Sequence, residues 1–533
     1  MLQYTIETSH KEIGKYFRHL ITSHGFNYNW QIKTLKNFSQ NTINIRVSEL
    51  DNKVAEEKPL IEYLFTTDSA KLAAMDLVTD SHGDEHSQKW GYIYDNNEYG
   101  YSIPSAIPIP ACCTKPIIIL GNEWNVNSYV FVASKSSYFA VSKNTNRIQH
   151  VIFSINIVGL LERAIYGSKL IDSSNFDSWA DIYGVDYFQG IAKTCYVDKI
   201  INFILYKMHI FSPQAFPVKI DYFPPNKSAP LIITGDSDSA SITQIEEYLN
   251  MVTEVGGNAT ILLKSGELLT EDFMVKEMQN GHCFGIHPFS ELNTAKGFCE
   301  KFDELVHNHV VKVGLPLPAV RNHYFQYIRG VDTHRLECEI PVLFDLNCVA
   351  ASGKTFIGSA SGIGFPLAFP PKVDHVVFEQ HPLHFPTLIE DDVFLFDYDY
   401  CYKSFDFGDR LSIQVCTDFL EEWLIKNRLP ALVNLHPEHV TVETKIILEA
   451  ILKFKSENNI WAPNLLDFAK WIDERSKTKL NVVGFSNDTV SVEIELTTSV
   501  LLDIPSLEGF SNETKLIGPG KHSFQIAIPE SKS

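Results

Sequence analysis

Two carboxylates one residue apart follow a short apolar run. The triplet Asp236-Ser237-Asp238 follows residues 231–234, with only Gly235 between them. Carboxylates this close to a buried strand end repel each other, so a proton or a bound cation must offset the repulsion. A divalent metal ion is the simplest compensator. The alternative is that Asp238 or Ser239 only caps a helix beginning near Ile242, a common role for these residue types.

Other polar residues also follow apolar runs. His287 ends the run 283–287, and Pro288 then stops the strand and leaves the imidazole at its rim. A carboxylate and imidazoles with open positions would suit zinc or another divalent ion. A lone histidine is more often structural, so the sequence order of the whole set matters more than any one member. The remaining members are Arg321 and His323 in Ala-Val-Arg-Asn-His, Asp345 after residues 342–344, and His436 after residues 431–435.

The elements that must position these residues alternate between short apolar runs and amphipathic stretches. Strands are predicted at residues 231–234, 259–263, 283–287, 342–344, 376–378 and 431–435. Helices are predicted at residues 242–255, 269–278, 302–311, 411–425, 442–452 and 465–471. Such alternation predicts parallel strands with covering helices, and about seven units fit a barrel. The polar residues above then lie at the carboxyl ends of the strands, where barrel enzymes keep their sites.

Composition changes divide the chain into three expected parts. The proline-rich stretch 211–230 is a natural boundary, because proline interrupts helices and central strands. We expect an N-terminal α+β accessory domain at 1–215, the (β/α) barrel at 225–478 and a small β-sandwich-like domain at 480–533. The last part shows period-two strands near 490–496 and 522–528, separated by glycine-containing turns.

The bulk properties exclude some classes of partner. The 533 residues carry 65 acidic and 45 basic side chains, a formal charge of −20, which argues against a nucleic acid or an anionic membrane as the main partner. The first residues do not resemble a secretory signal, and no run is long and apolar enough for a transmembrane helix. The nine cysteines form no C-x-x-C pair. A cytoplasmic protein with reduced thiols is therefore expected.

The order of the motifs resembles a known enzyme family. Four motifs follow the order found in the polysaccharide deacetylases, the NodB-homology carbohydrate esterases. They are an Asp-x-Asp motif, a Gly-His-x-x-Gly-x-His motif ending at His287, an arginine motif, and the strand ending in Leu-His436. The resemblance implies a distorted (β/α)7-type barrel. It also implies a metal-dependent hydrolase that removes an acetyl group from an N-acetylated sugar or polysaccharide precursor in bacterial surface-polysaccharide biosynthesis. The implied metal is zinc, with cobalt, manganese or nickel as alternatives.

The resemblance also implies roles for single residues. Asp236 matches the catalytic base, Arg321 the residue that orients it, and His436 the general acid, while Asp345 matches the next acidic residue of the family. Asp238 and His287 match metal ligands.

This sequence departs from the family pattern in two places. The usual form has adjacent aspartates, so with Ser237 between them the roles of Asp236 and Asp238 could be reversed. The family's second metal histidine is Glu291 in this chain. The third protein ligand is therefore either Glu291 or His323, and a variant branch with an Arg-x-His motif favours His323.

Two other functions stay open. A barrel glycoside hydrolase would use two carboxylates and no metal, and the three histidines argue against it. A catalytically inactive member, in which loss of the usual second histidine has abolished metal binding, would serve as a carbohydrate-binding or assembly protein.

Overall fold

The computed structural model contains two compact units. Unit 1 comprises Met1–Arg163, Tyr196–Pro225 and Asp473–Ser533, and the described residues of unit 2 lie within Asn226–Ile472. The boundary at Pro225 falls in the proline-rich stretch of the sequence. The structure describes residues 2–9, 11–35, 42–50, 57–66, 72–73, 75, 77–79, 90–95, 107–110, 114, 117–119, 125–132, 135–145, 148–157, 159–160, 196–266, 268–289, 295–314, 316–323, 336–337, 339–347, 364–368, 383–385, 387–390, 409–440, 445–486, 488–506 and 509–527.

Unit 2 is built on a sheet whose strands run parallel, except for one short antiparallel strand at its edge. The strand order is β18-β19-β17-β16-β15-β14-β13-β21-β20, and only the β18–β19 pair is antiparallel. The strands are β13 (Leu231–Asp236), β14 (Ala259–Leu263), β15 (Cys283–Ile286), β16 (Leu317–Val320), β17 (Val342–Asp345), β18 (Leu367–Ala368), β19 (Leu383–His384), β20 (Thr387–Glu390) and β21 (Ala431–Asn434).

The sheet of unit 2 curls, because one stretch of chain pairs with both of its sides. β19 pairs with β17, whereas β20, which begins only three residues after β19 ends, pairs with β21. The stretch from Leu383 to Glu390 therefore joins the two sides of the sheet. The predicted fold class, an α/β fold with a distorted barrel of parallel strands, is confirmed. No strand ranges were predicted for β16, β18, β19 or β20, although Arg321 and His323 were expected at a strand end, and the strand predicted at 376–378 lies outside the described residues.

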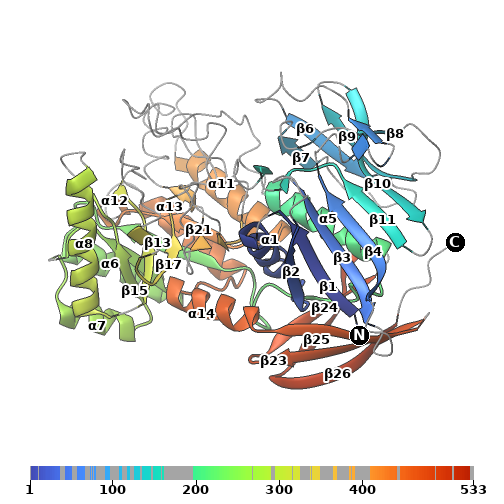
Figure 1. The fold of residues 1–533 in the computed structure, drawn as a ribbon. Coiled ribbons are helices and arrows are strands. Elements are labelled where there is room, and N and C mark those ends of the chain that lie inside the picture. The colour runs from blue at the N-terminus through green and yellow to red at the C-terminus, as the bar shows by residue number, and fades with distance from the viewer. Residues whose placement is uncertain are drawn as a thin grey trace. The chain divides into compact units, whose positions relative to one another are not determined.

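Helices surround the curled sheet (Figure 1). They are α6 (Ile242–Glu254), α7 (Glu271–Gln279), α8 (Ala295–Lys312), α11 (Asp409–Leu420), the π-helical turn η3 (Glu421–Lys426), α12 (Pro437–Val440), α13 (Lys445–Glu457) and α14 (Leu465–Ser476). Ser241 caps α6 in a capping box with Gln244, and Thr270 caps α7. The helix start near Ile242 is therefore capped by Ser241, and neither Asp238 nor Ser239 performs that role.

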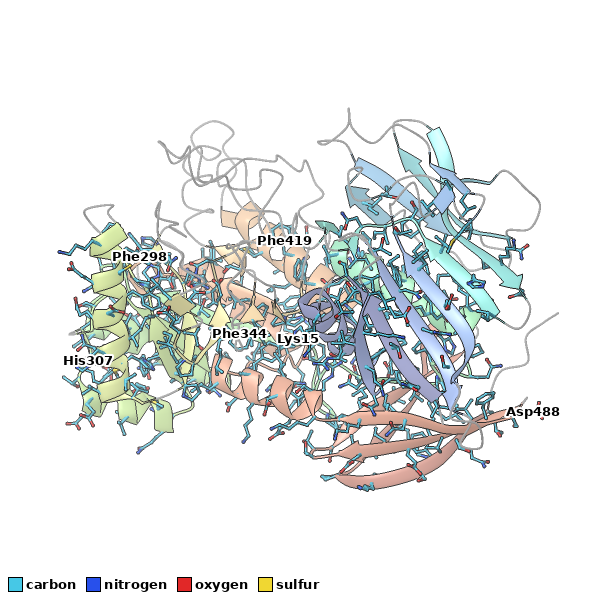
Figure 2. The ribbon with its side chains drawn as sticks, in the orientation of Figure 1. Lys15, Phe298, His307, Phe344, Phe419 and Asp488 are labelled. Carbon is cyan, nitrogen blue, oxygen red and sulfur yellow. The ribbon has the colours of Figure 1, made fainter. Side chains whose placement is uncertain are left out.

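The helix α8 packs against the sheet through an apolar stripe. Phe298, Phe302 and Leu305 lie on one face of the helix and pack with Ile286, Leu317, Val320 and Val342. His309 continues the same stripe one turn further and is also buried. His307 lies on the same helix but is exposed (Figure 2). The buried stripe holds β15 and β16, which end next to the candidate site.

Unit 1 has a large, mostly antiparallel sheet. In its described residues the main path runs β2-β1-β3-β4-β11-β10-β9-β6-β7, with β8 paired to β10 and β5 paired to β8. The strands and helices are β1 (Leu2–Thr8), α1 (Lys11–Ser23), β2 (Trp30–Thr34), β3 (Ile43–Leu50), β4 (Glu57–Phe65), β5 (Leu77–Thr79), β6 (Trp90–Asp95), β7 (Ile107–Pro110), β8 (Ile117–Ile119), β9 (Asn125–Val132), β10 (Lys135–Thr145), β11 (Ile148–Phe153) and α5 (Tyr196–Phe211).

Two small sheets complete unit 1. Their orders are β22-β23-β26 and β12-β24-β25, and β12 comes from the segment before the barrel. Their bounds are β12 (Lys219–Ile220), β22 (Lys479–Phe485), β23 (Thr489–Leu496), β24 (Val500–Ser506), β25 (Gly509–Ile517) and β26 (Gly520–Ala527). The strands predicted near 490–496 and 522–528 correspond to β23 and β26. The sequence suggested three separate parts. In the structure, the C-terminal strands belong to the same compact unit as the N-terminal sheet.

A buried arginine connects distant parts of unit 1. The Arg475 guanidinium donates hydrogen bonds to the carbonyl oxygens of Asp221 and Ser23, and the Arg475 carbonyl accepts one from the Asn27 side chain. Burial lowers the pKa of Arg475 to about 10, against the opposing effect of the Tyr222 and Asp221 charges.

Among the helices of the described residues, none combines the length and apolar character needed to cross a membrane.

Gly285 is needed for close approach of strands in unit 2. A Cβ at this position would lie 2.5 Å from Leu262 Cδ2 and 2.6 Å from the Ala319 carbonyl oxygen, and that backbone oxygen cannot move aside cheaply. We expect Gly285→Ala to lower the free energy of unfolding by about 1–3 kcal/mol, the usual cost of overpacking. Gly518→Ala, where no atom lies within 4 Å of the added Cβ, should change it little. Chemical denaturation of the two variants checks this, and equal stability of both would contradict it.

His309 should make stability depend on pH. Burial lowers its pKa from the ordinary value of 6.5 to about 4, and neither ring nitrogen has a hydrogen-bond partner among the described residues. Between these pH values the unfolded chain binds a proton that the folded chain does not, so stability is full above pH 6.5 and falls toward pH 4. The loss from this residue is about 3 kcal/mol.

His309→Leu should remove that part of the pH dependence, measured as denaturant unfolding of metal-free protein from pH 7 to pH 4. His307→Ala, on the exposed side of the same helix, should keep the wild-type slope. An unchanged slope in His309→Leu would show that the residue is not buried in its neutral form.

Candidate metal centre and catalytic groups

Asp238, His287 and His323 each bring one potential ligand atom to a common point. Oδ1 of Asp238 lies 3.0 Å from Nε2 of His287 and 3.0 Å from Nδ1 of His323. The two imidazole nitrogens are 3.1 Å apart. Three donors at such nearly equal separations can form one face of a coordination sphere with metal–ligand distances of about 2.0–2.2 Å.

Two members of this triad, Asp238 and His323, have pKa shifts that fit metal ligation. Burial raises the pKa of Asp238, but hydrogen bonds from His287 and His323 and the electrostatic effect of His287 and His436 outweigh it, so its pKa lies well below the usual range. Burial lowers the pKa of His323, and the His287 and Lys264 charges add to this, against the opposing effect of Asp238. An ionised carboxylate and a neutral imidazole are the forms that bind metals. The residues therefore fit a divalent ion.

Neighbouring parallel strands place the triad. Asp238 follows β13, His287 follows β15 and His323 follows β16, and these strands all end at the same edge of the sheet. Ser237, the residue between the two aspartates, is buried and accepts a hydrogen bond from the Lys264 backbone N–H, while its own N–H donates to the Leu262 carbonyl. Ser237 thus anchors the aspartate turn to the end of β14.

Asp236 belongs to a second, adjoining network. Its Oδ1 accepts a hydrogen bond from Arg321 Nη1 at 2.9 Å, and its Oδ2 accepts one from Asn434 Nδ2 at 2.9 Å. Arg321 Nη2 donates to the hydroxyls of Thr234 and Thr387. The guanidinium is fully buried. Asp236 is therefore held by an ion pair and an amide, separately from the triad.

One imidazole connects the two networks. His287 Nδ1 lies 3.6 Å from Asp236 Oδ2, on the other side of the ring from the nitrogen that faces Asp238. A carboxylate beside the second nitrogen of a ligating histidine commonly fixes the orientation and tautomer of the ring. The geometry thus gives the two aspartates different surroundings: Asp238 faces imidazoles and Asp236 faces Arg321.

His436 approaches the second carboxylate oxygen of Asp238. It follows β21, it is buried, and its Nε2 is 3.8 Å from Asp238 Oδ2. Pro437 begins α12 directly after it, a position at which proline is favoured. Glu438 of that helix accepts hydrogen bonds from the N–H and hydroxyl of Ser239, which joins this turn to the aspartate turn.

Asp345 lies in a neighbouring polar group and is not part of the triad. It ends β17, where its Oδ1 accepts hydrogen bonds from the backbone and side-chain nitrogens of Asn347. Asn347 in turn accepts one from the Asn322 N–H. Because Asn322 stands between Arg321 and His323, Asp345 supports the segment that carries both. Its predicted catalytic role stays a prediction.

The structure brings together most of the residues that the sequence singled out. Asp238, His287 and His323 meet in the triad, and Asp236, Arg321 and His436 adjoin it. Glu291, the alternative third ligand, lies outside the described residues. The roles of all these residues stay predictions, and the geometry favours Asp238 over Asp236 as the ligand.

Sequence reasoning missed three residues of the site. Lys264 Nζ lies 3.3 Å from His323 Nε2 and 3.9 Å from Asp238 Oδ1. Asn434 and Thr387 hold Asp236 and Arg321, as described above. Two of these residues could have been found from their positions in the sequence. Asn434 ends the apolar run 431–434, and Lys264 directly follows the run 259–263. For Thr387 there was none, because β20 itself was not predicted.

Comparison with known proteins gives likenesses in structure only. No protein-family model matches the sequence, and no curated protein matches it. The chain is similar in structure to carbohydrate deacetylases. Peptidoglycan deacetylase PdaC from Bacillus subtilis is 11% identical, with 48% of this chain and 95% of that chain covered and a TM-score of 0.29.

Two further solved structures are similar. A polysaccharide deacetylase from Bacillus cereus is 14% identical, with 45% of this chain and 92% of that chain covered and a TM-score of 0.28. The carbohydrate deacetylase Agd3 is 8% identical, with 86% of this chain and 83% of that chain covered and a TM-score of 0.36. At these TM-scores no role of a residue transfers to this chain, so the site must be judged on its own geometry.

Metal binding tests the triad directly. Metal-free protein titrated with zinc in a calorimeter should bind one ion, and Asp238→Asn, His287→Ala and His323→Ala should each weaken binding about 100-fold or more, since loss of a ligand exceeds the loss of an outer partner. Glu291→Ala should bind zinc like the wild type. His307→Ala is the exposed control. Zinc binding that is lost in Glu291→Ala and kept in His323→Ala would contradict this ligand set.

Proposed function

We propose that this protein is a metal-dependent hydrolase that removes the acetyl group from an N-acetylated sugar or saccharide. The observation that carries the proposal is the meeting of Asp238, His287 and His323 at 3.0–3.1 Å beside the Asp236–Arg321 ion pair and His436. A metal-type triad, a separately held carboxylate and a further imidazole are the groups that hydrolysis of an amide requires. The sugar as substrate, and its place in surface-polysaccharide biosynthesis, come from the motif resemblance and stay predictions.

The triad would hold the ion, with Asp238 Oδ1, His287 Nε2 and His323 Nδ1 as donors. When bound, a divalent ion polarises a carbonyl group and lowers the pKa of water. Asp236 is proposed as the base that takes the proton of the attacking water. Arg321 and Asn434 each hold one of its oxygens, so the carboxylate keeps a single orientation.

His436 is proposed as the proton donor to the leaving group. Its Nε2 lies 3.8 Å from Asp238 Oδ2, the carboxylate oxygen that does not face the two triad imidazoles. Water oxygen joins the acyl carbon, the carbon–nitrogen bond breaks, and the nitrogen leaves with the proton from His436. The products are acetate and the free amine, and the proton taken by Asp236 restores His436 through solvent.

The two other functions find less support in the geometry. A glycoside hydrolase needs two carboxylates that flank a glycosidic bond. Here Asp238 lies against two imidazoles and Asp236 is paired with a buried arginine. For an inactive protein, the argument was the missing second metal histidine at position 291. His323 offers an imidazole at the triad, so the departure at that position does not by itself remove the third ligand.

Acetate release is the test of the activity. Zinc-loaded protein should release acetate from N-acetylated glucosamine oligomers, and treatment with a chelator should abolish this until zinc is restored. Asp236→Asn and His436→Ala should each lower kcat by about 10²–10⁴-fold, the usual contribution of a general base or acid. His307→Ala, exposed on α8, is the control with wild-type activity.

O-acetylated oligosaccharides serve as the comparison substrate. Faster acetate release from them would assign the enzyme to esters. No release from either class by zinc-loaded wild type would show that the proposed hydrolase is wrong.

A further inference from the structure

Lys264 places a positive charge at the metal-type triad without belonging to its donor set. It follows the last residue of β14, so it lies at the same strand edge as Asp238 and His287. Its Nζ is 3.3 Å from His323 Nε2 and 3.9 Å from Asp238 Oδ1. The side chain is 26% exposed, so the ammonium group can meet a ligand from solvent.

The position of this lysine is well defined by its surroundings. Its backbone N–H donates to the Ser237 hydroxyl within the aspartate turn. Its ammonium lies over the ring of Phe289, 4.9 Å from the ring centroid, and that ring packs edge-on against His323. A cation over an aromatic face is attracted to it. The first contact fixes the backbone of Lys264, and the Phe289 ring holds its ammonium beside His323.

Among the residues that the structure describes, the charges at the site leave Lys264 without a carboxylate of its own once a metal binds. In the described part of the chain, the carboxylate within ion-pair distance of Lys264 is Asp238. That same carboxylate oxygen is the proposed metal ligand. Asp236 is already paired with Arg321, so a divalent ion adds two positive charges next to the ammonium. Such a concentration of like charges is unfavourable unless an anion offsets it.

Lys276, another lysine of unit 2, is arranged differently. Lys276 also lies over a phenylalanine ring, that of Phe273, but it is paired with Glu246 and Glu277 on the surface of α7. Its charge is therefore neutralised by residues of the chain itself. Lys264 lacks a second acidic neighbour among the described residues and faces the site instead.

We propose that Lys264 binds an anionic oxygen group of the substrate, a carboxylate or a phosphate. The substrate is then an acylated saccharide that carries this group close to the acetyl group to be removed. The two nitrogens of an imidazole point to opposite sides of the ring. A group held near His323 Nε2 is therefore separate from the carbonyl that reacts at the triad. This inference rests on the proposed function and adds the class of substrate to it.

Anion binding tests the role of Lys264 without any turnover. Zinc-loaded wild type, Lys264→Met and Lys264→Arg are titrated with acetate and with inorganic phosphate in a calorimeter, after metal analysis shows equal zinc content. Lys264→Met should raise the dissociation constant of at least one anion about tenfold, equivalent to about 1.4 kcal/mol. Lys264→Arg should stay within about threefold of the wild type because it keeps the charge.

Lys276→Met is the matched control, since it removes another lysine that lies over a phenylalanine ring. It should bind both anions like the wild type. The anion that weakens more in Lys264→Met identifies the carboxylate or the phosphate as the group recognised. If Lys264→Met changes neither dissociation constant by more than about twofold, the inference is wrong.

Turnover gives the second test. The substrates are methyl glycosides that differ only at carbon 6: N-acetylglucosamine, its uronic acid and its 6-phosphate. We expect wild type to favour one acidic substrate in kcat/KM, and Lys264→Met to lower the acidic-to-neutral ratio about tenfold through KM. An equal ratio in both proteins contradicts the inference but leaves the deacetylase proposal intact. If wild type hydrolyses none of the three or the oligomers above, the deacetylase proposal fails, while the calorimetric result still decides the anion site.

Discussion

The buried ion pair between Arg321 and Asp236 is the interaction on which the rest of the site depends. A guanidinium removed from water is costly unless it is paired and hydrogen-bonded. Arg321 meets this condition with Asp236 and the hydroxyls of Thr234 and Thr387. Its partners come from β13 and β20, and Arg321 itself follows β16. The pair therefore forms only when three strands that are distant in sequence have reached their places in the sheet.

The serine between the two aspartates separates their tasks. Ser237 bonds to the end of β14, and the carboxylates on either side of it enter different surroundings. Asp236 accepts hydrogen bonds from Arg321 and Asn434, whereas Asp238 faces His287 and His323. Two carboxylates so close in sequence would repel each other in one common environment. A guanidinium offsets the charge of Asp236, and a metal ion held by the triad would offset that of Asp238.

The curled parallel sheet explains why single residues from separate motifs can act together. The residues that follow β13, β14, β15, β16 and β21 all emerge at one edge, so a short loop after each strand contributes at least one polar side chain. The apolar stripe of α8 holds β15 and β16 in the core behind that edge. Lys264 also follows one of these strands, β14, but its charge distinguishes it from the metal ligands. It adds a positive charge next to the site where the triad would hold a metal cation.

The sequence by itself predicted the type of chemistry and determined most of the elements. Apolar runs ending in Asp236, His287 and His436 predicted strand ends that carry polar groups, because both the alternation of elements and the residue types are local properties. Only the tertiary structure decided which side chains meet. The register between strands that are far apart in the chain decides several features of the site. It places Asp238 in the triad, turns His323 Nδ1 toward it, and brings Asn434, Thr387 and Lys264 to their partners. That register is set by sheet curvature and core packing, neither of which a local pattern encodes.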